Sequence, residues 1–160
     1  MLGINGVGYI VDKEDTQCYT TTVNISSKAE YGIRAMVEIA AANGPLKRGV
    51  IARRQGIPIP FLTQVLRALV NAGLVSSSRG PDGGYLLAQP ADGITLLDIV
   101  TRLQGPVMPK GCLETHGSDA CLIGGADCLL REVWSALKSA NEQVLRSVTL
   151  DDLSPVHRGG

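Results

Sequence analysis

Residues 60–87 read PFLTQVLRALVNAGLVSSSRGPDGGYLL, which is a helical pattern followed at once by the pattern of a β-hairpin. Pro60 suits a first helical turn, and one apolar stripe then runs toward Gly73 through Leu62, Val65, Leu66, Leu69 and Val70. Beyond Gly73, two short strand-like runs flank a turn made of Pro, Asp and Gly. We therefore predict a helix joined directly to a hairpin that carries Arg79 at its tip.

Two further helices are predicted before this stretch. Ser27 and Glu30 have the spacing of a capping box, so we expect a first helix that begins at Ser27 and ends before Pro45. A short second helix is expected over residues 46–55, with Gly56 as its C-terminal stop. Two helices joined by a tight glycine-containing turn indicate a helix-turn-helix, whose later helix lies in the major groove of DNA. The hairpin that follows would then be a wing.

The second half of the chain is predicted to hold a long loop between two helices. Thr95 would cap a short helix, with Asp98 three residues on, and Gly105 would end it. More than twenty residues without a helical or strand pattern follow, and such a loop is unusual inside a compact domain unless it binds something. A long helix is expected over residues 129–148, with one apolar side: Leu130, Val133, Trp134, Leu137, Val144, Leu145 and Val148. This stripe favours a two-fold dimer contact over packing within one chain.

Charge is unevenly distributed along a chain of 160 residues whose net charge is zero. No acidic residue lies between Ile39 and Pro81, a segment that contains Lys47, Arg48, Arg53, Arg54, Arg67 and Arg79. Such a block can face phosphate, although a solvated basic face is the competing interpretation. No apolar run approaches the roughly 20 residues of a membrane span, and residues 1–24 lack the pattern of a secretory signal. We therefore expect a cytoplasmic protein with no membrane contact.

Three cysteines lie in the expected loop, namely Cys112, Cys121 and Cys128, with eight and six residues between them. In a cytoplasmic protein such a cluster indicates metal binding or redox chemistry rather than disulfides. Thiolates suit iron–sulfur clusters and zinc, and a bound metal supplies the free energy that orders a loop. The spacing leaves the metal open, because Cys112, His116, Cys121 and Cys128 also fit a zinc site. Cys18 stands apart and has no assigned role.

Wing, recognition helix and loop together resemble the IscR, NsrR and RirA group of bacterial winged-helix iron–sulfur regulators. The resemblance covers residues 25–153 and includes SSKAEYGIRAM at 26–36, the hairpin at 74–87, the loop cysteines, Trp134 and TLDDL at 149–153. It implies a homodimer that binds a near-palindromic operator in double-stranded DNA. It also implies that Cys112, Cys121 and Cys128 hold a 2Fe-2S or 4Fe-4S cluster that senses cluster status, redox state, nitric oxide or iron.

The fourth cluster ligand departs from one branch of this group. Members similar to IscR have a histidine three residues after the last cysteine, but this chain has Arg131, which cannot bind iron while protonated. In members similar to NsrR a carboxylate at the start of the first helix reaches the cluster, and Glu30 occupies that position. The resemblance makes Glu30 the first candidate, with its capping role toward Ser27 as the competing interpretation and His116 as a third choice.

The residues expected to contact DNA fall into two kinds. The resemblance places Phe61, Thr63, Gln64 and Arg67 on the recognition helix and Arg79 at the tip of the wing. Gln64 and Thr63 are candidates for base edges, because Gln pairs with adenine and the Thr methyl group can meet thymine. Phosphate contacts are expected from four basic side chains: Lys28, Arg48, Arg54 and Arg67.

The predicted fold is mainly α, with a small β-hairpin wing and a long C-terminal dimerisation helix. We expect a flexible extension over residues 1–24, a winged helix-turn-helix domain over 25–92, a cluster-binding loop and dimerisation helix over 93–153, and a flexible tail over 154–160. Two other functions compete: a zinc- or thiol-switched DNA-binding regulator, and an iron–sulfur electron carrier or assembly protein. The basic block and wing argue against the carrier. Catalysis is not expected, because the chain lacks a nucleophile motif and a phosphate-binding glycine loop.

Overall fold

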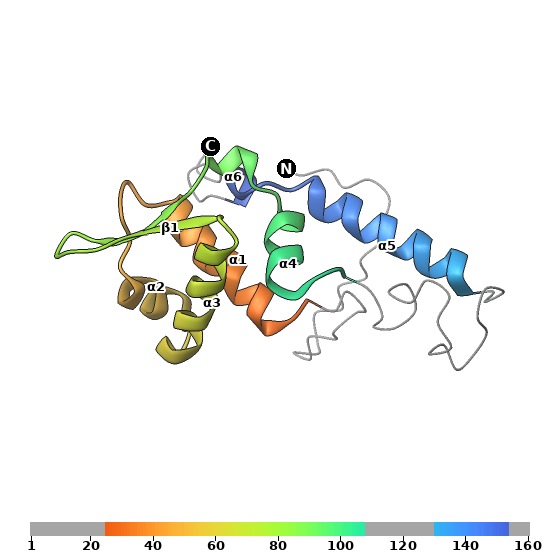
Figure 1. Ribbon diagram of the computed structural model, residues 1–160. Helices are drawn as coiled ribbons and strands as arrows, with labels where there is room; N and C mark the ends of the chain where they lie inside the picture. Colours follow the sequence, from red (N-terminus) through yellow and green to blue (C-terminus); the bar gives the residue numbers. More distant parts are fainter. Residues whose placement is uncertain (1–24, 108–129, 154–160) are drawn as a thin grey trace, which may run out of the picture.

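The structure of the chain is a computed structural model that describes residues 25–107 and 130–153 (Figure 1). The predicted extension over 1–24, the cysteines and the tail over 154–160 lie outside these residues. The fold is mainly helical with one two-stranded antiparallel hairpin, as the sequence predicts. Its elements in chain order are α1 (Ser27–Ala40), α2 (Arg48–Gln55), α3 (Ile59–Asn71), β1 (Val75–Ser78), β2 (Gly84–Leu87), the 3₁₀ turn η1 (Ala91–Gly93), α4 (Leu96–Gln104), α5 (Leu130–Arg146) and α6 (Leu150–Leu153).

The cap of α1 differs from the prediction by one residue. Ser26, not Ser27, is the N-cap, and its hydroxyl accepts a hydrogen bond from the backbone N–H of Ala29 at 3.2 Å. Glu30 is therefore one residue too late to close a capping box, so the predicted pairing of Ser27 with Glu30 is wrong. The Glu30 side chain is 59% exposed and forms an ion pair with Arg34 at 3.5 Å. Its carboxylate is thus not committed to the helix end.

The start of α2 is also later than predicted, because Leu46 forms an isolated antiparallel bridge with Tyr85 of the wing. Its N–H donates to the Tyr85 carbonyl and its carbonyl accepts from the Tyr85 N–H, both at 3.0 Å, which ties the segment before α2 to the wing. Gly84 permits this approach, since a Cβ there would lie 2.8 Å from backbone atoms of Leu46. Gly56 ends α2 in the left-handed conformation with φ 61°, as predicted.

The core is built around α1, which packs against α2, α3, α4 and β2. The predicted stripe of α3 is largely buried, with Leu62, Val65, Leu66 and Leu69 facing the core. Helices α1 and α4 approach each other closely at Gly32, where a Cβ would overlap the side chain of Leu103. This contact fixes the last turn of α4 beside the first half of α1.

Thr95 and Asp98 form the predicted capping box of α4. The Asp98 N–H donates to the Thr95 hydroxyl at 3.2 Å, and the Thr95 N–H donates to the Asp98 carboxylate at 3.0 Å. Burial raises the pKa of Asp98, but the Thr95 hydrogen bonds and the charges of Arg102 and Arg146 outweigh it, so the net shift is downward. Arg102 also donates to the Ala72 carbonyl at 2.7 Å, which joins α4 to the end of α3.

Helix α5 runs along the side of the molecule and extends beyond the rest of the fold (Figure 1). Its C-terminal end is anchored, because Leu145 is buried and the Leu96 N–H donates to the Val148 carbonyl at 2.9 Å. Val133, Leu137 and Val144 from the predicted apolar side are exposed. Among the described residues, no helix is long and apolar enough to cross a membrane.

Candidate nucleic-acid interface

The outward face of α3 carries polar and basic side chains. Leu62, Val65, Leu66 and Leu69 anchor the opposite face, so the 3.6-residue period turns Pro60, Gln64, Arg67 and Asn71 outward, and all four are exposed. Gln64 and Arg67 were predicted for this face. An amide and a guanidinium one turn apart can address a base edge and a neighbouring phosphate.

Thr63 of α3 faces α2, and its hydroxyl already has hydrogen-bond partners within the chain. Its hydroxyl donates to the Ile59 carbonyl at 2.7 Å and accepts from Nη1 of Arg48 at 3.1 Å. The two predicted contact residues Thr63 and Arg48 are therefore side by side. Because the hydroxyl has both kinds of partner, the methyl group is the part of Thr63 best suited to a base.

The C-terminal end of α2 is tied to α1 by a polar network. Nε of Arg34 donates to the Gln55 side-chain carbonyl at 3.0 Å, and the same guanidinium donates to the Gln55 backbone carbonyl. Nε2 of Gln55 donates to Glu38 at 2.7 Å, and Glu38 pairs with Arg54 at 3.2 Å. Arg54, a predicted phosphate contact, therefore already has an acidic partner. Arg34 was not predicted as a site residue, since the sequence shows it only as a cation on the polar side of the first helix.

An aromatic pair holds the other flank of α3 against α1. The rings of Tyr31 and Phe61 meet edge to face, with centroids 5.5 Å apart and planes at 83°, and Arg34 lies over Tyr31 at 5.8 Å. Phe61 is still 41% exposed. Its ring is thus packed on α1 while its outer edge stays open. Lys28, also on α1, is partly exposed.

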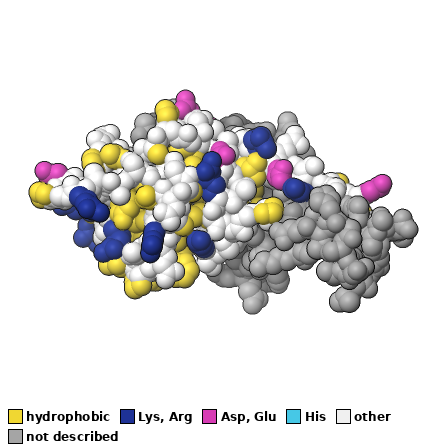
Figure 2. Space-filling view, viewed as in Figure 1, with side chains coloured by type: hydrophobic (Ala, Val, Ile, Leu, Met, Phe, Trp, Pro, Cys, Tyr) yellow, Lys and Arg dark blue, Asp and Glu magenta, His cyan; other side chains and the backbone are white. Residues whose placement is uncertain are grey.

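The wing projects from the body of the molecule, as Figure 1 shows for β1 and β2. Arg79 is exposed at its tip, between Ser78 and Gly80, and Gly80 has φ 110°. A Cβ on Gly83 would lie 2.4 Å from the Ser78 carbonyl oxygen, so this tight turn requires glycine. Lys and Arg side chains gather over the part of the surface formed by the hairpin, α2 and α3 (Figure 2).

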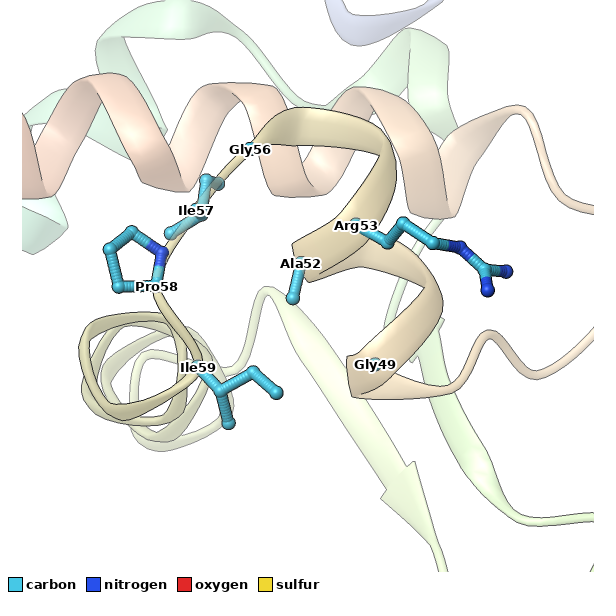
Figure 3. A pocket seen from close by; sticks show the side chains of 7 residues that line it. All are labelled: Gly49, Ala52, Arg53, Gly56, Ile57, Pro58 and Ile59. Carbon is cyan, nitrogen blue, oxygen red and sulfur yellow. The ribbon is translucent and has the colours of Figure 1, made fainter.

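A shallow hollow of about 470 Å³ opens between α2 and the first turn of α3 (Figure 3). The side chains of Ala52 and Ile59 point into it, whereas Arg53 extends outward. Ile59 is 49% exposed. Ile59 was not predicted as a site residue, because the helix was expected to begin at Pro60, whereas α3 begins at Ile59. Its position at the helix end leaves it uncovered.

The predicted metal ligands are mostly outside the described residues. Within residues 25–107 and 130–153 no group of three or more His, Cys, Asp or Glu side chains could hold a metal, and no Cys or His occurs there. Cys112, Cys121, Cys128 and His116 belong to the segment between Val107 and Leu130. Glu30 is described, and lies in the first turn of α1. The Ser26 N–H donates to the Gln104 side chain at 2.6 Å, so the end of α4 lies beside that turn.

A helix-turn-helix with a basic surface and a glycine-tipped wing defines a winged-helix DNA-binding protein. The chain belongs to the Rrf2 family, described as iron-dependent transcriptional regulators, whose pattern matches residues 25–155. It is therefore a DNA-binding transcriptional regulator and not an enzyme.

Named relatives and solved structures agree with this family. The regulator CymR of Bacillus subtilis is 37% identical over 134 residues, which cover 82% of this chain and 90% of that protein. The regulator IscR of Erwinia tasmaniensis is 35% identical over 133 residues, covering 82% and 78%. The structure of CymR, the global cysteine regulator of B. subtilis, has a TM-score of 0.67 at 35% identity and covers 82% and 96%. The T. potens IscR structure has a TM-score of 0.62 at 36% identity, covering 81% and 84%.

Proposed function

We propose that this regulator is a cytoplasmic homodimer that binds a near-palindromic operator and senses an iron–sulfur cluster held by Cys112, Cys121 and Cys128. The three thiols lie in one segment between α4 and α5. Three soft thiolate donors within seventeen residues fit an iron–sulfur cluster, and a bound cluster would supply a redox- and ligand-sensitive iron centre. The observation that carries the proposal is this donor set in a family described as iron-dependent.

The packing of α4 supports a link between the cysteine segment and the DNA-binding elements. Arg102 bonds to the end of α3, and Gln104 bonds to the start of α1, only a few residues before that segment begins. A change in the segment would therefore act on an element that touches both helices.

Glu30 remains our first candidate for the fourth ligand. Its carboxylate is exposed, and it lies in the first turn of α1 beside the end of α4. The ion pair with Arg34 is also exposed, and such pairs contribute only about 0–1 kcal/mol. Glu30 can therefore exchange Arg34 for another partner at little cost. His116 is the second candidate, since imidazole is also an iron ligand.

The exposed apolar side chains of α5 support the homodimer. Val133, Leu137 and Val144 follow one side of the helix and have no cover among the described residues. A second copy of α5 would bury them symmetrically, and a two-fold dimer suits two half-sites about one helical turn apart.

A thiol switch or zinc site without a cluster is the second candidate. It is favoured by the similarity to CymR, of which one solved Staphylococcus aureus structure is described as an oxidized form, at 29% identity and a TM-score of 0.62. In this version the same three cysteines would control DNA binding. An electron carrier or assembly protein does not fit the family.

Anaerobic purification tests the cofactor. We expect a coloured protein with iron and sulfide in cluster stoichiometry, and loss of both in alanine variants of Cys112, Cys121 or Cys128. Cys18→Ala is the matched control and should keep the colour. An air-free preparation without iron or sulfide would contradict the cluster, and zinc bound through the same thiols would establish the second candidate. A Glu30→Gln variant should change the absorption spectrum without changing the melting temperature.

A further inference from the structure

Ile59 is 49% exposed, and no other apolar side chain among residues 25–107 and 130–153 covers it. The described residues expose five large apolar side chains, namely Ile59, Phe61, Val133, Leu137 and Val144. The last three form the side of α5 discussed above, and Phe61 packs on Tyr31. Ile59 instead borders the hollow between α2 and α3 (Figure 3).

The surroundings of Ile59 favour DNA as the molecule that covers it. Arg53 lines the same hollow, and the chain has no acidic residue between Ile39 and Pro81. Arg48 is bonded to Thr63, whose own hydroxyl is bonded to the Ile59 carbonyl, so a cation lies one helical turn away. A nonpolar protein partner would leave these charges unpaired, whereas a polyanion matches them.

The position of Ile59 within α3 indicates which part of DNA it meets. It is the first residue of the recognition helix, whose N-terminal residues contact base edges in winged and related helix-turn-helix proteins. An aliphatic side chain cannot hydrogen-bond to a base. The one apolar group on the major-groove edges of unmodified DNA is the C5 methyl group of thymine.

We propose that Ile59 is a specificity-determining residue that contacts the C5 methyl group of a thymine in each operator half-site, with Ala52 behind it in the hollow. Gln64 and Arg67, further along the helix, would address neighbouring positions. The inference rests on the family's DNA-binding function and is independent of the cluster.

The test removes the methyl group from the DNA and the apolar side chain from the protein. An operator is first enriched from random duplex DNA with the full-length chain, and each symmetric pair of thymines is then replaced by deoxyuridine, which lacks only the methyl group. Replacement of one such pair should weaken wild-type binding by about fourfold per half-site. Ile59→Ala should bind the original operator as weakly as the wild type binds the deoxyuridine operator, with little further loss on that operator.

Two variants act as controls. Thr63→Ser removes the other methyl group near this position, and Gln64→Ala removes a neighbouring polar contact. Both variants should keep the response to deoxyuridine at the thymine pair whose response Ile59→Ala abolishes. Because Ile59 is half-exposed, Ile59→Ala should melt close to the wild type. Three outcomes would overturn the proposal: deoxyuridine leaves wild-type affinity unchanged at every thymine, it weakens Ile59→Ala as much as the wild type, or the loss of affinity disappears in Thr63→Ser and not in Ile59→Ala. If no DNA were enriched at all, the family function itself would fail.

Discussion

At the scale of single residues, Asp98 shows how one carboxylate can serve several elements. It closes the cap of α4 with Thr95 and lies near Arg102 and Arg146, which belong to α4 and α5. Its pKa is lowered from the ordinary value of 3.8 despite burial. A lowered pKa in the folded state means that the ionised group stabilises the fold above about pH 4. That contribution is lost as the pH falls through the lowered pKa.

The Asp98→Asn variant tests this sign. At pH 7 we expect its free energy of unfolding to be about 0.5–1 kcal/mol lower than that of the wild type, because the charge-assisted part of the cap is removed. The difference from the wild type should shrink as the pH falls below about 4, where the wild-type carboxylate is also neutralised. Urea unfolding at several pH values measures both effects. Asp92→Asn, at an exposed position in η1, is the control; a pH-independent gap for Asp98→Asn would contradict the account.

At the scale of elements, the wing and the helix-turn-helix are joined through the bridge between Leu46 and Tyr85. The bridge places β2 beside the segment that leads into α2. Gly84 makes the approach sterically possible. The angle of the wing relative to α3 therefore depends on a glycine that contributes no side chain to either surface.

We predict that Gly84→Ala separates the wing from the segment before α2. The added Cβ would meet backbone that cannot rotate away, so one or both hydrogen bonds of the bridge should break, at a cost of about 1–3 kcal/mol in unfolding free energy. Operator affinity should fall as well, because Arg79 would be misplaced. Gly93→Ala is a matched control, since nothing lies within 4 Å of its Cβ position. Equal stability of the two variants would contradict the role given to the bridge.

The order of helices α1 to α5 and of the hairpin could be predicted from the sequence, whereas η1 and α6 were not predicted. The apolar stripe of α3, the Thr95 cap and Gly56 could be identified because the helical period and the capping residues involve positions close together in the sequence. The cap of α1 was misplaced because Ser26 and Ser27 are both good caps, and packing selects between them. Leu46 was assigned to a helix because its partner, Tyr85, is far away in sequence. The exposure of Ile59 also depends on tertiary packing.

The candidate DNA contacts were predictable in kind but not in their partners. The family resemblance placed Gln64 and Arg67 on the recognition helix and Arg79 on the wing, and all three side chains are exposed. The ion pair of Arg54 with Glu38 and the hydrogen bond of Arg48 to Thr63 join different helices, so no sequence pattern predicts them. The ligand roles of the cysteines and Glu30 stay predictions.

At the scale of the whole molecule, the apolar side of α5 predicts how two copies meet. Leu137 is near the middle of the helix and 46% exposed in the single chain. Leu137→Asp should raise the dimer dissociation constant by about a hundredfold or more, because two leucines lose their burial. Sedimentation equilibrium measures this. Ser139→Asp, on the other side of α5, should dimerise normally; an unaffected dimer in Leu137→Asp would contradict the α5 interface.

The most direct test of the account is operator affinity measured without air before and after removal of the metal. We predict a change of about 5- to 150-fold for the wild type, the usual range of coupling between two sites. The variant with Cys112, Cys121 and Cys128 all replaced by alanine should show no change, with an affinity close to that of the metal-free wild type. Equal affinity of the wild type in both states, or the same change in the triple variant, would contradict control of DNA binding through these thiols.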